Sequence, residues 1–175
     1  MWRAGLTPPL ISRRSCKAEP MALDDDIALL SRVPLFASLG GEPIRLLAFS
    51  TETRFLRAGD VLFKEGQAAD CGYVVAAGQI ALTNDGGLSE HLAGPGCLIG
   101  EIALIVETLR PATATARDAA TVLRIPRALF RRVMTEFPEA AVRIHEDFRE
   151  KMRATTADLL RVGRLFEKDG RRQPS

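Results

Sequence analysis

The 175-residue sequence predicts an α+β fold, an antiparallel β jelly roll (double-stranded β-helix) flanked by N-terminal helices and a long C-terminal helix. Three observations predict this order. Residues 24–50 carry apolar side chains at helical spacing, residues 51–125 form short β-rich runs between glycines, and helical spacing returns after residue 126. Many short strands with glycine turns are typical of an antiparallel sandwich or barrel such as a jelly roll.

The first part of the chain is expected to change from an extension into helices. Residues 1–20 are polar, broken by prolines and without periodicity, which predicts a flexible N-terminal extension. Three aspartates at 24–26 precede an apolar periodic stretch, which is the pattern of a helix start, and Pro34 ends that stretch. A second helix is predicted over 42–50. These helices begin the domain that we predict for residues 21–138.

The middle of the chain predicts strands. Glycines separate short runs that are rich in β-branched and aromatic residues. The sequence Asn84-Asp85-Gly86-Gly87 predicts a hairpin turn between two of these runs. The predicted strands are residues 54–57, 61–63, 73–76, 79–83, 88–92, 113–116 and 121–125.

After Pro126 the pattern is helical, with a short helix, a break at Phe137-Pro138 and one long predicted helix over 139–166. Apolar side chains recur along the long helix at steps of three and four residues, which is typical of a two-helix seam. We therefore expect a homodimer through residues 139–166, and the alternative is one helix packed against its own β-domain. Residues 167–175 are expected to fray. The stripe consists of Val142, His145, Phe148, Met152, Thr155, Leu159, Val162 and Phe166.

Composition and cysteine usage argue against several classes of protein. No run of about 18 apolar residues is present, and prolines break the apolar part of residues 1–20, so neither a membrane span nor a secretory signal is expected. The three cysteines form no CxxC pair, and His91 and His145 lie at no metal-ligand spacing. We therefore expect reduced thiols, a cytoplasmic location and no metal. No nucleophile and base pair is evident, so we expect no enzyme activity.

The formal net charge of +2 hides an uneven distribution. Residues 21–123 carry a net charge of −6 and residues 124–175 carry +5. A basic C-terminal part can form a nucleic-acid-binding patch, but a solvated helix face with a frayed end has the same composition. Only about nine residues follow Phe166, whereas a helix-turn-helix with its wing needs on the order of 60. We therefore expect the solvated face, with no DNA partner and no membrane partner.

One segment, residues 94–116, carries residues suited to holding a ligand. Gly100 lets the backbone approach a ligand and opens a short apolar helix predicted over 101–106, whose first N–H groups attract an anion. Arg110 carries a planar fork that suits two phosphate oxygens, and Glu101 can accept hydrogen bonds from a hydroxyl. A Glu and an Arg at this spacing are, taken alone, more often an incidental surface ion pair. Together they would make a site for a small molecule with one phosphate and a sugar hydroxyl.

The motif Gly100-Glu101-Ile102-Ala103-Leu104, followed by Arg110-Pro111-Ala112-Thr113-Ala114, resembles the phosphate-binding cassette of cyclic nucleotide-binding domains. That family includes the cAMP receptor protein of bacteria and the regulatory subunits of protein kinase A. The upstream strings 57–67 and 73–79 are also similar to family patterns, so the resemblance covers about residues 27–165.

The resemblance implies a set of ligand-binding residues and a mechanism. Glu101 would accept from the ribose 2′-hydroxyl, Arg110 would pair with the cyclic phosphate, and the long helix would move over the bound base. Pro111 has no N–H for the phosphate and lacks the threonine hydroxyl of cGMP-selective members, which favours cAMP over cGMP. The predicted ligand-binding residues are Gly100, Glu101, Ile102, Ala103, Arg110, Pro111, Ala112 and Thr113.

The expected function is that of a stand-alone cyclic nucleotide sensor that exposes or hides a dimer surface or a surface for a protein partner. A second hypothesis is a regulator-like domain that senses redox state or haem through Cys71, Cys97 or His91. A third is a degenerate interaction module that binds no nucleotide.

Overall fold

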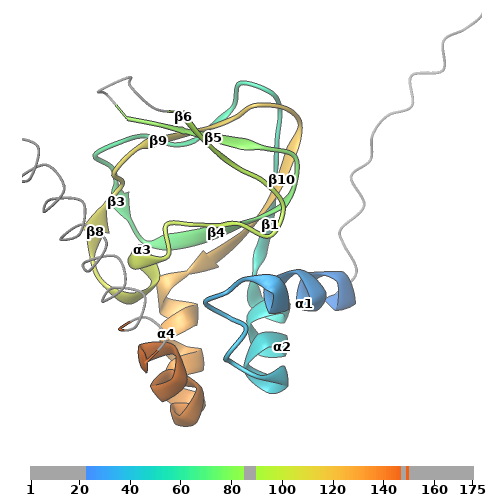
Figure 1. The fold of residues 1–175 in the computed structure, drawn as a ribbon, viewed down its shortest axis with the longest axis vertical. Coiled ribbons are helices and arrows are strands. Elements are labelled where there is room, and N and C mark those ends of the chain that lie inside the picture. The colour runs from blue at the N-terminus through green and yellow to red at the C-terminus, as the bar shows by residue number, and fades with distance from the viewer. Residues whose placement is uncertain (1–22, 85–89, 147–148, 150–175) are drawn as a thin grey trace, which may run out of the picture.

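Two four-stranded antiparallel sheets face each other, and helices cover the outer side of one of them (Figure 1). The structure is a computed structural model that describes residues 23–84, 90–146 and 149. We refer to the sheet beneath the helices as sheet A and to the other as sheet B. Sheet A has the order β1-β10-β4-β7, and its strands are β1 (Glu52–Leu56), β10 (Ala120–Pro126), β4 (Cys71–Ala77) and β7 (Leu98–Ile99).

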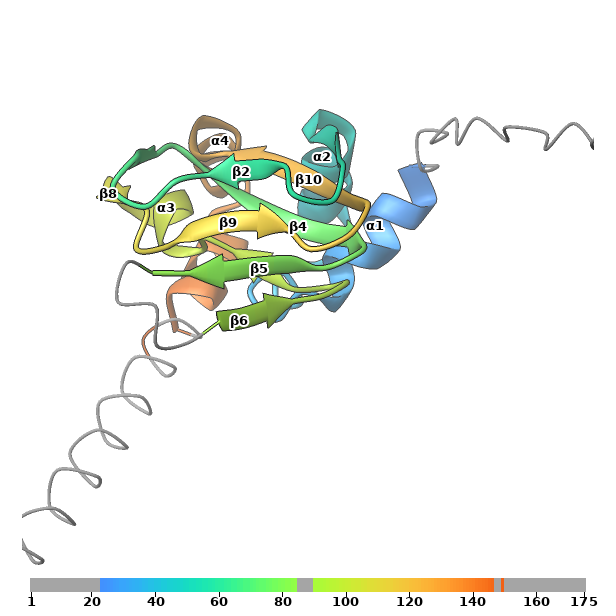
Figure 2. The same cartoon turned by 90° about the horizontal axis from the view of Figure 1, so that it is seen from above.

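Sheet B lies over sheet A and has the order β2-β9-β5-β6 (Figure 2). A separate two-stranded pair, β3 with β8, closes one side of the space between the sheets. The strands of sheet B are β2 (Val61–Phe63), β9 (Thr113–Ala116), β5 (Ile80–Thr83) and β6 (Glu90–Ala93), and those of the pair are β3 (Ala68–Ala69) and β8 (Thr108–Leu109).

Sheet A separates two hydrophobic cores, because successive side chains of a strand point to opposite faces. Val74 of β4 and Leu123 of β10 face the helices, where they join the larger core. Tyr73, Val75 and Val122, their neighbours in sequence, face sheet B and join the core between the sheets. The backbone of β4 and β10 is thus the common wall of both cores.

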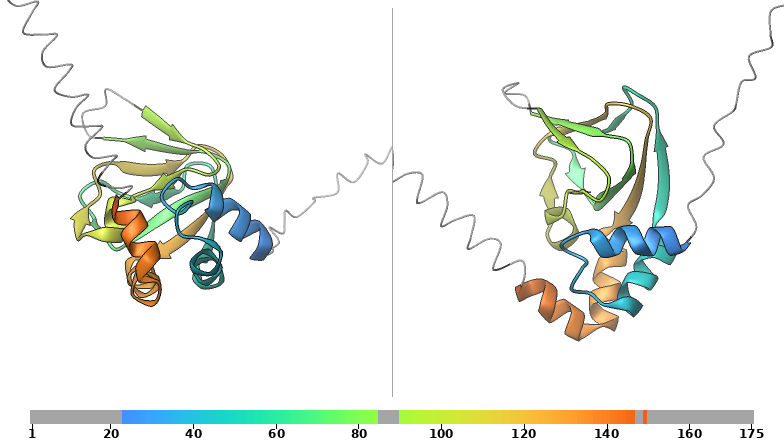
Figure 3. Two further views of the ribbon diagram at one scale, coloured as in Figure 1. Left: turned by 60° about the horizontal axis from the view of Figure 1, so that its bottom comes forward. Right: turned by 45° about the vertical axis from the view of Figure 1, so that its right-hand side comes forward.

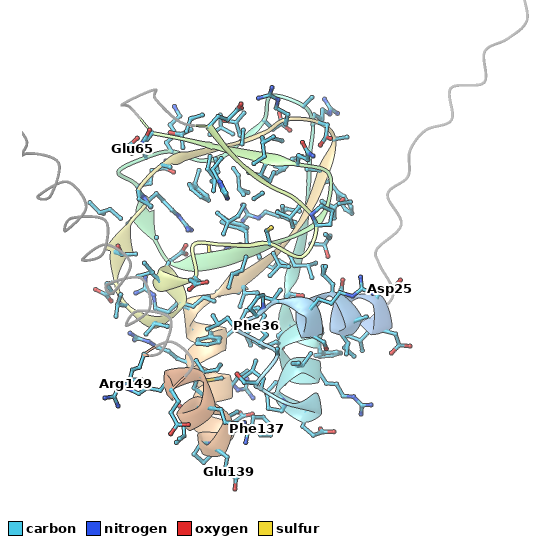
Figure 4. The ribbon with its side chains drawn as sticks, viewed as in Figure 1. Asp25, Phe36, Glu65, Phe137, Glu139 and Arg149 are labelled. Atoms are coloured by element: carbon cyan, nitrogen blue, oxygen red, sulfur yellow. The ribbon has the colours of Figure 1, made fainter. Side chains whose placement is uncertain are left out.

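The helices are short and gather on one side of sheet A (Figures 1 and 3). Residues 138–146 continue as a helical segment after the break at Phe137. Phe36, in the turn after the first helix, is fully buried, and its ring centroid lies 6.1 Å from that of Phe130 (Figure 4). The helices are α1 (Leu23–Arg32), α2 (Gly41–Ser50), α3 (Ile102–Ile105) and α4 (Arg127–Glu136).

The helical segment 138–146 is tied back to the N-terminal helices by Arg143. Its Nε donates to the carbonyl oxygen of Ser38 at 2.8 Å, and its Nη2 donates to that of Leu39 at 3.4 Å. The segment therefore packs against the turn between α1 and α2, and the described chain ends beside α3 (Figure 3).

The predicted antiparallel sheets with flanking helices are confirmed. The structure adds β3, β7 and β8, which were not predicted, and it shortens the predicted helix 101–106 to Ile102–Ile105. The turn predicted at 84–87 lies mostly outside the described residues, but the strands on either side of it pair, with Thr83 opposite Glu90. Most of the helix predicted over 139–166 lies outside the described residues, as do the predicted extension 1–20 and tail 167–175.

Candidate functional site

The segment between β7 and β9 forms a loop around one buried arginine. The chain leaves β7 through Gly100, whose φ of 78° lies in the left-handed region that favours glycine. Glu101 follows in right-handed helical conformation and starts α3. The chain then forms β8 and reaches Arg110, and β9 begins at Thr113.

Helix α3 is a single turn held tightly against sheet A. The amides of Ala103 and Leu104 donate to the carbonyls of Gly100 and Glu101, both at 3.1 Å. Leu104 is fully buried, and a Cβ at Gly72 of β4 would lie 3.2 Å from its Cγ. The absence of a side chain at Gly72 therefore lets α3 lie directly on β4. Ala103 and Leu104 use their amides within the turn, so only amides that precede Ala103 are left for an anion. These are fewer than the amides that the predicted helix 101–106 would offer.

The backbone of Arg110 is fixed from the β2–β3 connection. Its N–H donates to the carbonyl of Gln67 at 2.8 Å, and its carbonyl accepts from the N–H of Gly66 at 2.9 Å. The whole residue is only 4% exposed. A buried guanidinium is expensive to desolvate unless other groups stabilise its charge.

The side chain of Arg110 finds such groups on two strands, β2 and β4. Its Nη2 donates to the carbonyl oxygen of Cys71 at 2.8 Å and lies 3.3 Å from the Cys71 sulfur. Its Cζ lies 4.2 Å from the ring centroid of Phe63 and 5.5 Å from that of Tyr73. The faces of aromatic rings attract a guanidinium, and more strongly where water is excluded.

One nitrogen of this guanidinium has no such partner. Nη1 of Arg110 is buried and makes no hydrogen bond to any residue that the structure describes. It lies against Gly100, where a Cβ would overlap with it. Leaving a charged donor unpaired in the interior costs more than leaving a neutral one, so this nitrogen is suited to an anionic acceptor from outside the chain.

Two cavities meet at Glu101 and Leu98, which line both of them. The first has a volume of about 410 Å³ and includes Arg110 and Gly100. The second has a volume of about 570 Å³ and extends between β5, β6 and the turn after α1. Each is of the size that small ligands occupy in proteins.

The site combines one buried guanidinium with neutral and acidic groups that can accept hydrogen bonds. Burial, followed by Cys71, raises the pKa of the Tyr73 phenol above its usual value, so its ring stays neutral beside the guanidinium. The pKa of the Asp70 carboxyl is lowered, first by a hydrogen bond with the Cys71 side chain and also by Arg124. The half-buried carboxylate of Glu101 can accept from a hydroxyl at the junction of the two cavities.

Comparison with known proteins identifies the family. The sequence profile of the cyclic nucleotide-binding domain matches residues 53–137, which include the whole loop from Gly100 to Thr113. A solved structure of a cyclic nucleotide-binding-like protein from Brucella abortus is 46% identical, with a TM-score of 0.58 over 64% of this chain and 99% of that chain. The chain belongs to the cyclic nucleotide-binding domain family.

Other relatives of this cyclic nucleotide-binding domain differ in size and context. The regulatory domain of Toxoplasma gondii PKA, solved with cAMP, is 26% identical, with a TM-score of 0.58 over 63% of this chain and 44% of that chain. Lysophospholipase NTE1 of Chaetomium globosum is 30% identical over 136 residues. That alignment covers 75% of this chain and 9% of the relative, so the chain spans a small part of that protein's length.

Six of the eight predicted ligand-binding residues of the domain line the cavity of about 410 Å³: Gly100, Glu101, Ile102, Ala103, Arg110 and Pro111. The other two, Ala112 and Thr113, do not line it. The Thr113 hydroxyl instead accepts a hydrogen bond at 3.0 Å from the amide of Glu65, on the side of the sheets away from α2 and α4 (Figure 4).

The sequence did not predict the groups that hold Arg110. Phe63, Cys71 and Tyr73 come from β2 and β4, about 40 residues before Arg110. The contact of Arg110 with two phosphate oxygens stays a prediction, and in the structure its Nη2 donates to the carbonyl oxygen of Cys71. A signal was present, since Phe63 and Tyr73 lie within the two upstream strings that resemble family patterns.

Of the three residues predicted to sense redox state or haem, Cys71 lies apart from the other two. Cys97 and His91 are exposed and line the cavity of about 570 Å³, whereas Cys71 is buried beside Arg110. Within residues 23–84 and 90–146 there is no cluster of three His, Cys, Asp or Glu side chains that could hold a metal ion. In the same part of the chain, no helix has the length and apolar character needed to cross a membrane.

Proposed function

We propose that this domain binds a cyclic nucleotide, with cAMP preferred to cGMP. The observation that carries the proposal is the buried Nη1 of Arg110, which has no hydrogen-bond partner among the described residues. A cyclic phosphate would supply the anionic acceptor that this nitrogen lacks.

The two cavities support a definite orientation of the ligand. The phosphate would lie at Nη1 of Arg110, and Glu101 at the junction would accept from the ribose hydroxyl. The base would then extend into the larger cavity, which includes Leu82 and His91. A rigid ligand with phosphate, sugar and base in this order matches the order of the groups along the site.

The preference for cAMP rests on Pro111. It is exposed at the edge of the cavity and has no side-chain hydroxyl and no N–H to offer. Family members that prefer cGMP carry a threonine at this position, which makes a polar contact with guanine. Pro111 cannot make that contact.

Isothermal titration calorimetry of the purified chain with cAMP and cGMP tests the proposal. The variant Arg110→Ala should weaken cAMP binding by about 2–4 kcal/mol, or about 30- to 1,000-fold in Kd. The matched control is Arg117→Ala, because Arg117 is exposed and pairs with Glu90 on the surface. Equal affinity of the Arg110→Ala variant and the parent, or no binding of either nucleotide by the parent, would contradict the proposal. Haem in the same titrations tests the second hypothesis.

We also propose that the ligand moves the C-terminal helix. A cavity of about 280 Å³ lies between α3, α4 and the segment 138–146, and Leu104 and Ile144 both line it. Space at this contact would allow α3 to shift against the helical segment when the cassette closes on a phosphate. The movement would expose or cover the stripe of residues 139–166, through which we propose a homodimer.

The strand order supports the jelly roll. With the β3–β8 pair set aside, the strands alternate between the two sheets except at the β5–β6 hairpin, so that the first, third, sixth and eighth lie in sheet A and the others in sheet B. Such alternation is what two Greek keys folded into a jelly roll require.

The context of the domain is part of the proposal. We propose a cytoplasmic, non-enzymatic sensor that acts alone or on a protein partner, without DNA or membrane contacts. Its lysophospholipase relatives show the alternative, a module within a longer protein. The intact mass of the protein from its native host distinguishes the two.

A further inference from the structure

Arg110 is held in a way that leaves one nitrogen for the ligand. Nη2 carries two hydrogens, and two acceptors of Cys71 face it, the carbonyl oxygen at 2.8 Å and the sulfur at 3.3 Å. Nη1, the other terminal nitrogen, is buried without a partner in the described chain. Cys71 therefore holds one terminal nitrogen of the guanidinium, and the other terminal nitrogen remains for the ligand.

An anchor at Nη2 alone does not fix the plane of the guanidinium. The Cys71 sulfur is a weak acceptor, so a rotation about the hydrogen bond to the Cys71 carbonyl costs little and would move Nη1 away from Gly100. A flat group stacked against the guanidinium prevents such a rotation, because the attraction to a ring is strongest over its face.

Phe63 provides that flat group. Its ring lies 4.2 Å from Cζ of Arg110, and it is itself stacked on Tyr73, with centroids 5.9 Å apart and planes 24° apart. Phe63 belongs to sheet B and Tyr73 to sheet A, so the stack spans the space between the sheets.

The local backbone directs the Phe63 ring into this space. The register of β2 against β9 shifts between Val61 and Phe63, an irregularity of the kind that re-aims a side chain. The residue opposite Phe63 is the fully buried Ala114, whose small side chain leaves room for the ring. Phe63 itself is 8% exposed.

We infer that Phe63 is a positioning residue for the ligand phosphate: its ring orients Arg110 so that Nη1 alone meets one of the two exocyclic phosphate oxygens. This inference rests on the proposed function. It differs from a two-pronged contact, in which both oxygens would be bound alike.

A contact through Nη1 alone makes the site sensitive to the stereochemistry of the phosphate. The two exocyclic oxygens of a cyclic nucleotide point in different directions, and sulfur is a poorer hydrogen-bond acceptor than oxygen. Replacement of one oxygen by sulfur should therefore weaken binding only when that oxygen faces Nη1. We expect the parent protein to bind the two phosphorothioate diastereomers of cAMP with affinities that differ about tenfold.

The test compares the parent with Phe63→Leu, which keeps apolar volume but removes the ring face. Calorimetry gives the Kd of cAMP and of each diastereomer, and Phe49→Leu serves as control because Phe49 is 79% exposed on α2. We expect Phe63→Leu to raise the Kd of cAMP roughly three- to thirtyfold. The ratio between the diastereomers should fall towards one, and the control should keep both values.

A purely structural role for Phe63 would weaken both diastereomers equally and leave their ratio unchanged, which would overturn the inference. A parent protein that binds both diastereomers equally well would overturn it too. A parent protein that binds neither cAMP nor its phosphorothioate diastereomers contradicts the proposed function itself, so the two failures are distinct. If Phe63→Leu does not fold, pentafluorophenylalanine at position 63 keeps the ring shape, reverses the charge of its face and should lower the ratio in the same way.

Discussion

At the scale of single residues, the site depends on the close approach of Gly100 to Arg110. The backbone at Gly100 has a positive φ, and a Cβ there would overlap with Nη1. Gly59 has a similar φ of 88°, but a Cβ there would meet no atom within 4 Å. The two glycines therefore separate the effect of backbone strain from the effect of displacing the arginine.

We expect Gly100→Ala and Gly59→Ala to destabilise the fold by similar amounts, about 1 kcal/mol each, from strain in the left-handed region. Only Gly100→Ala should also weaken cAMP binding, by more than about thirtyfold, because it moves Nη1. Urea denaturation and calorimetry on both variants measure the two effects. Equal loss of affinity in both variants would show that strain alone disturbs the site.

A second residue makes stability depend on pH. Asp26 of α1 is buried, and its Oδ1 has no hydrogen-bond partner among the described residues. Burial, followed by the charge of Asp25, raises the pKa of the Asp26 carboxyl above 3.8. The folded state then holds this proton more tightly than the unfolded state, so the contribution of Asp26 to stability falls as pH rises from 3.8 through the raised pKa.

Asp26→Asn should therefore raise the free energy of unfolding near neutral pH, by roughly 1 kcal/mol, because the buried charge is removed. Below pH 3.8 the variant and the parent should be equally stable. Thermal unfolding across this pH range measures the difference. Asp24→Asn is the control, since Asp24 is exposed in the same helical turn and its loss should slightly destabilise α1 through the helix dipole.

The residues of the cassette that line the cavity of about 410 Å³ could be predicted because they lie close together in the sequence. Gly100, Glu101 and Arg110 lie within one short stretch, and their chemistry is recognisable without knowing the fold. Phe63 and Cys71 reach Arg110 only through the pairing of distant strands, which a single sequence does not reveal. The use of Nη2 by Cys71 could not be predicted for the same reason.

At the scale of elements, Arg127 ties α4 to the cassette. Its Nε donates to the carbonyl of Ala103 in α3 at 2.7 Å, its Nη2 donates to the carbonyl of Ala69 in β3, and its Nη1 lies 3.4 Å from the Glu107 carboxylate. Movement of α3 would therefore act on α4 through this side chain as well as through the apolar contact of Leu104 with Phe130.

Arg127→Met should lower the free energy of unfolding by about 2 kcal/mol, because it leaves the carbonyls of Ala103 and Ala69 without this donor. Arg132→Met removes an exposed pair with Glu136 on the same helix and should cost less than about 0.5 kcal/mol. Urea midpoints at unchanged slope measure both variants. Similar midpoints for the two would show that Arg127 does not connect α4 to α3.

The elements that sequence could predict are those with enough residues to show a period. The sequence predicts the strand 113–116 with its observed bounds and the first two helices to within a residue or two, whereas the glycines on either side predict the three-residue strand 61–63. The strands β3, β7 and β8 have two residues each, too few for any alternation to appear. Their pairing is set by the loop around Arg110 rather than by their own sequence.

At the scale of the whole molecule, the apolar stripe of residues 139–166 begins on the surface. Val142, its first member, is 58% exposed in the described segment. The remaining members from Phe148 onward lie outside the described residues. The segment packs on its own domain through Ala140 and Ile144, so Val142 lies on another face of it, which the dimer that we propose would cover.

The variant Leu159→Glu should convert a dimer into a monomer, because a charge in the middle of an apolar seam is costly to bury. Sedimentation equilibrium of the variant and the parent measures the mass of each. Glu139→Gln, at the exposed start of the helical segment, serves as control and should leave the mass unchanged. A parent that sediments as a monomer at all concentrations, with and without cAMP, would contradict the dimer.

Sheet A has a consequence for how such domains diverge in evolution. Its two faces belong to separate cores, one shared with the helices and one shared with sheet B. Substitutions at Val74 or Leu123 disturb the helices first, whereas those at Tyr73 or Val122 disturb the space between the sheets first. Mutations on the helical side can therefore alter the helices and their surface without altering the packing around Arg110.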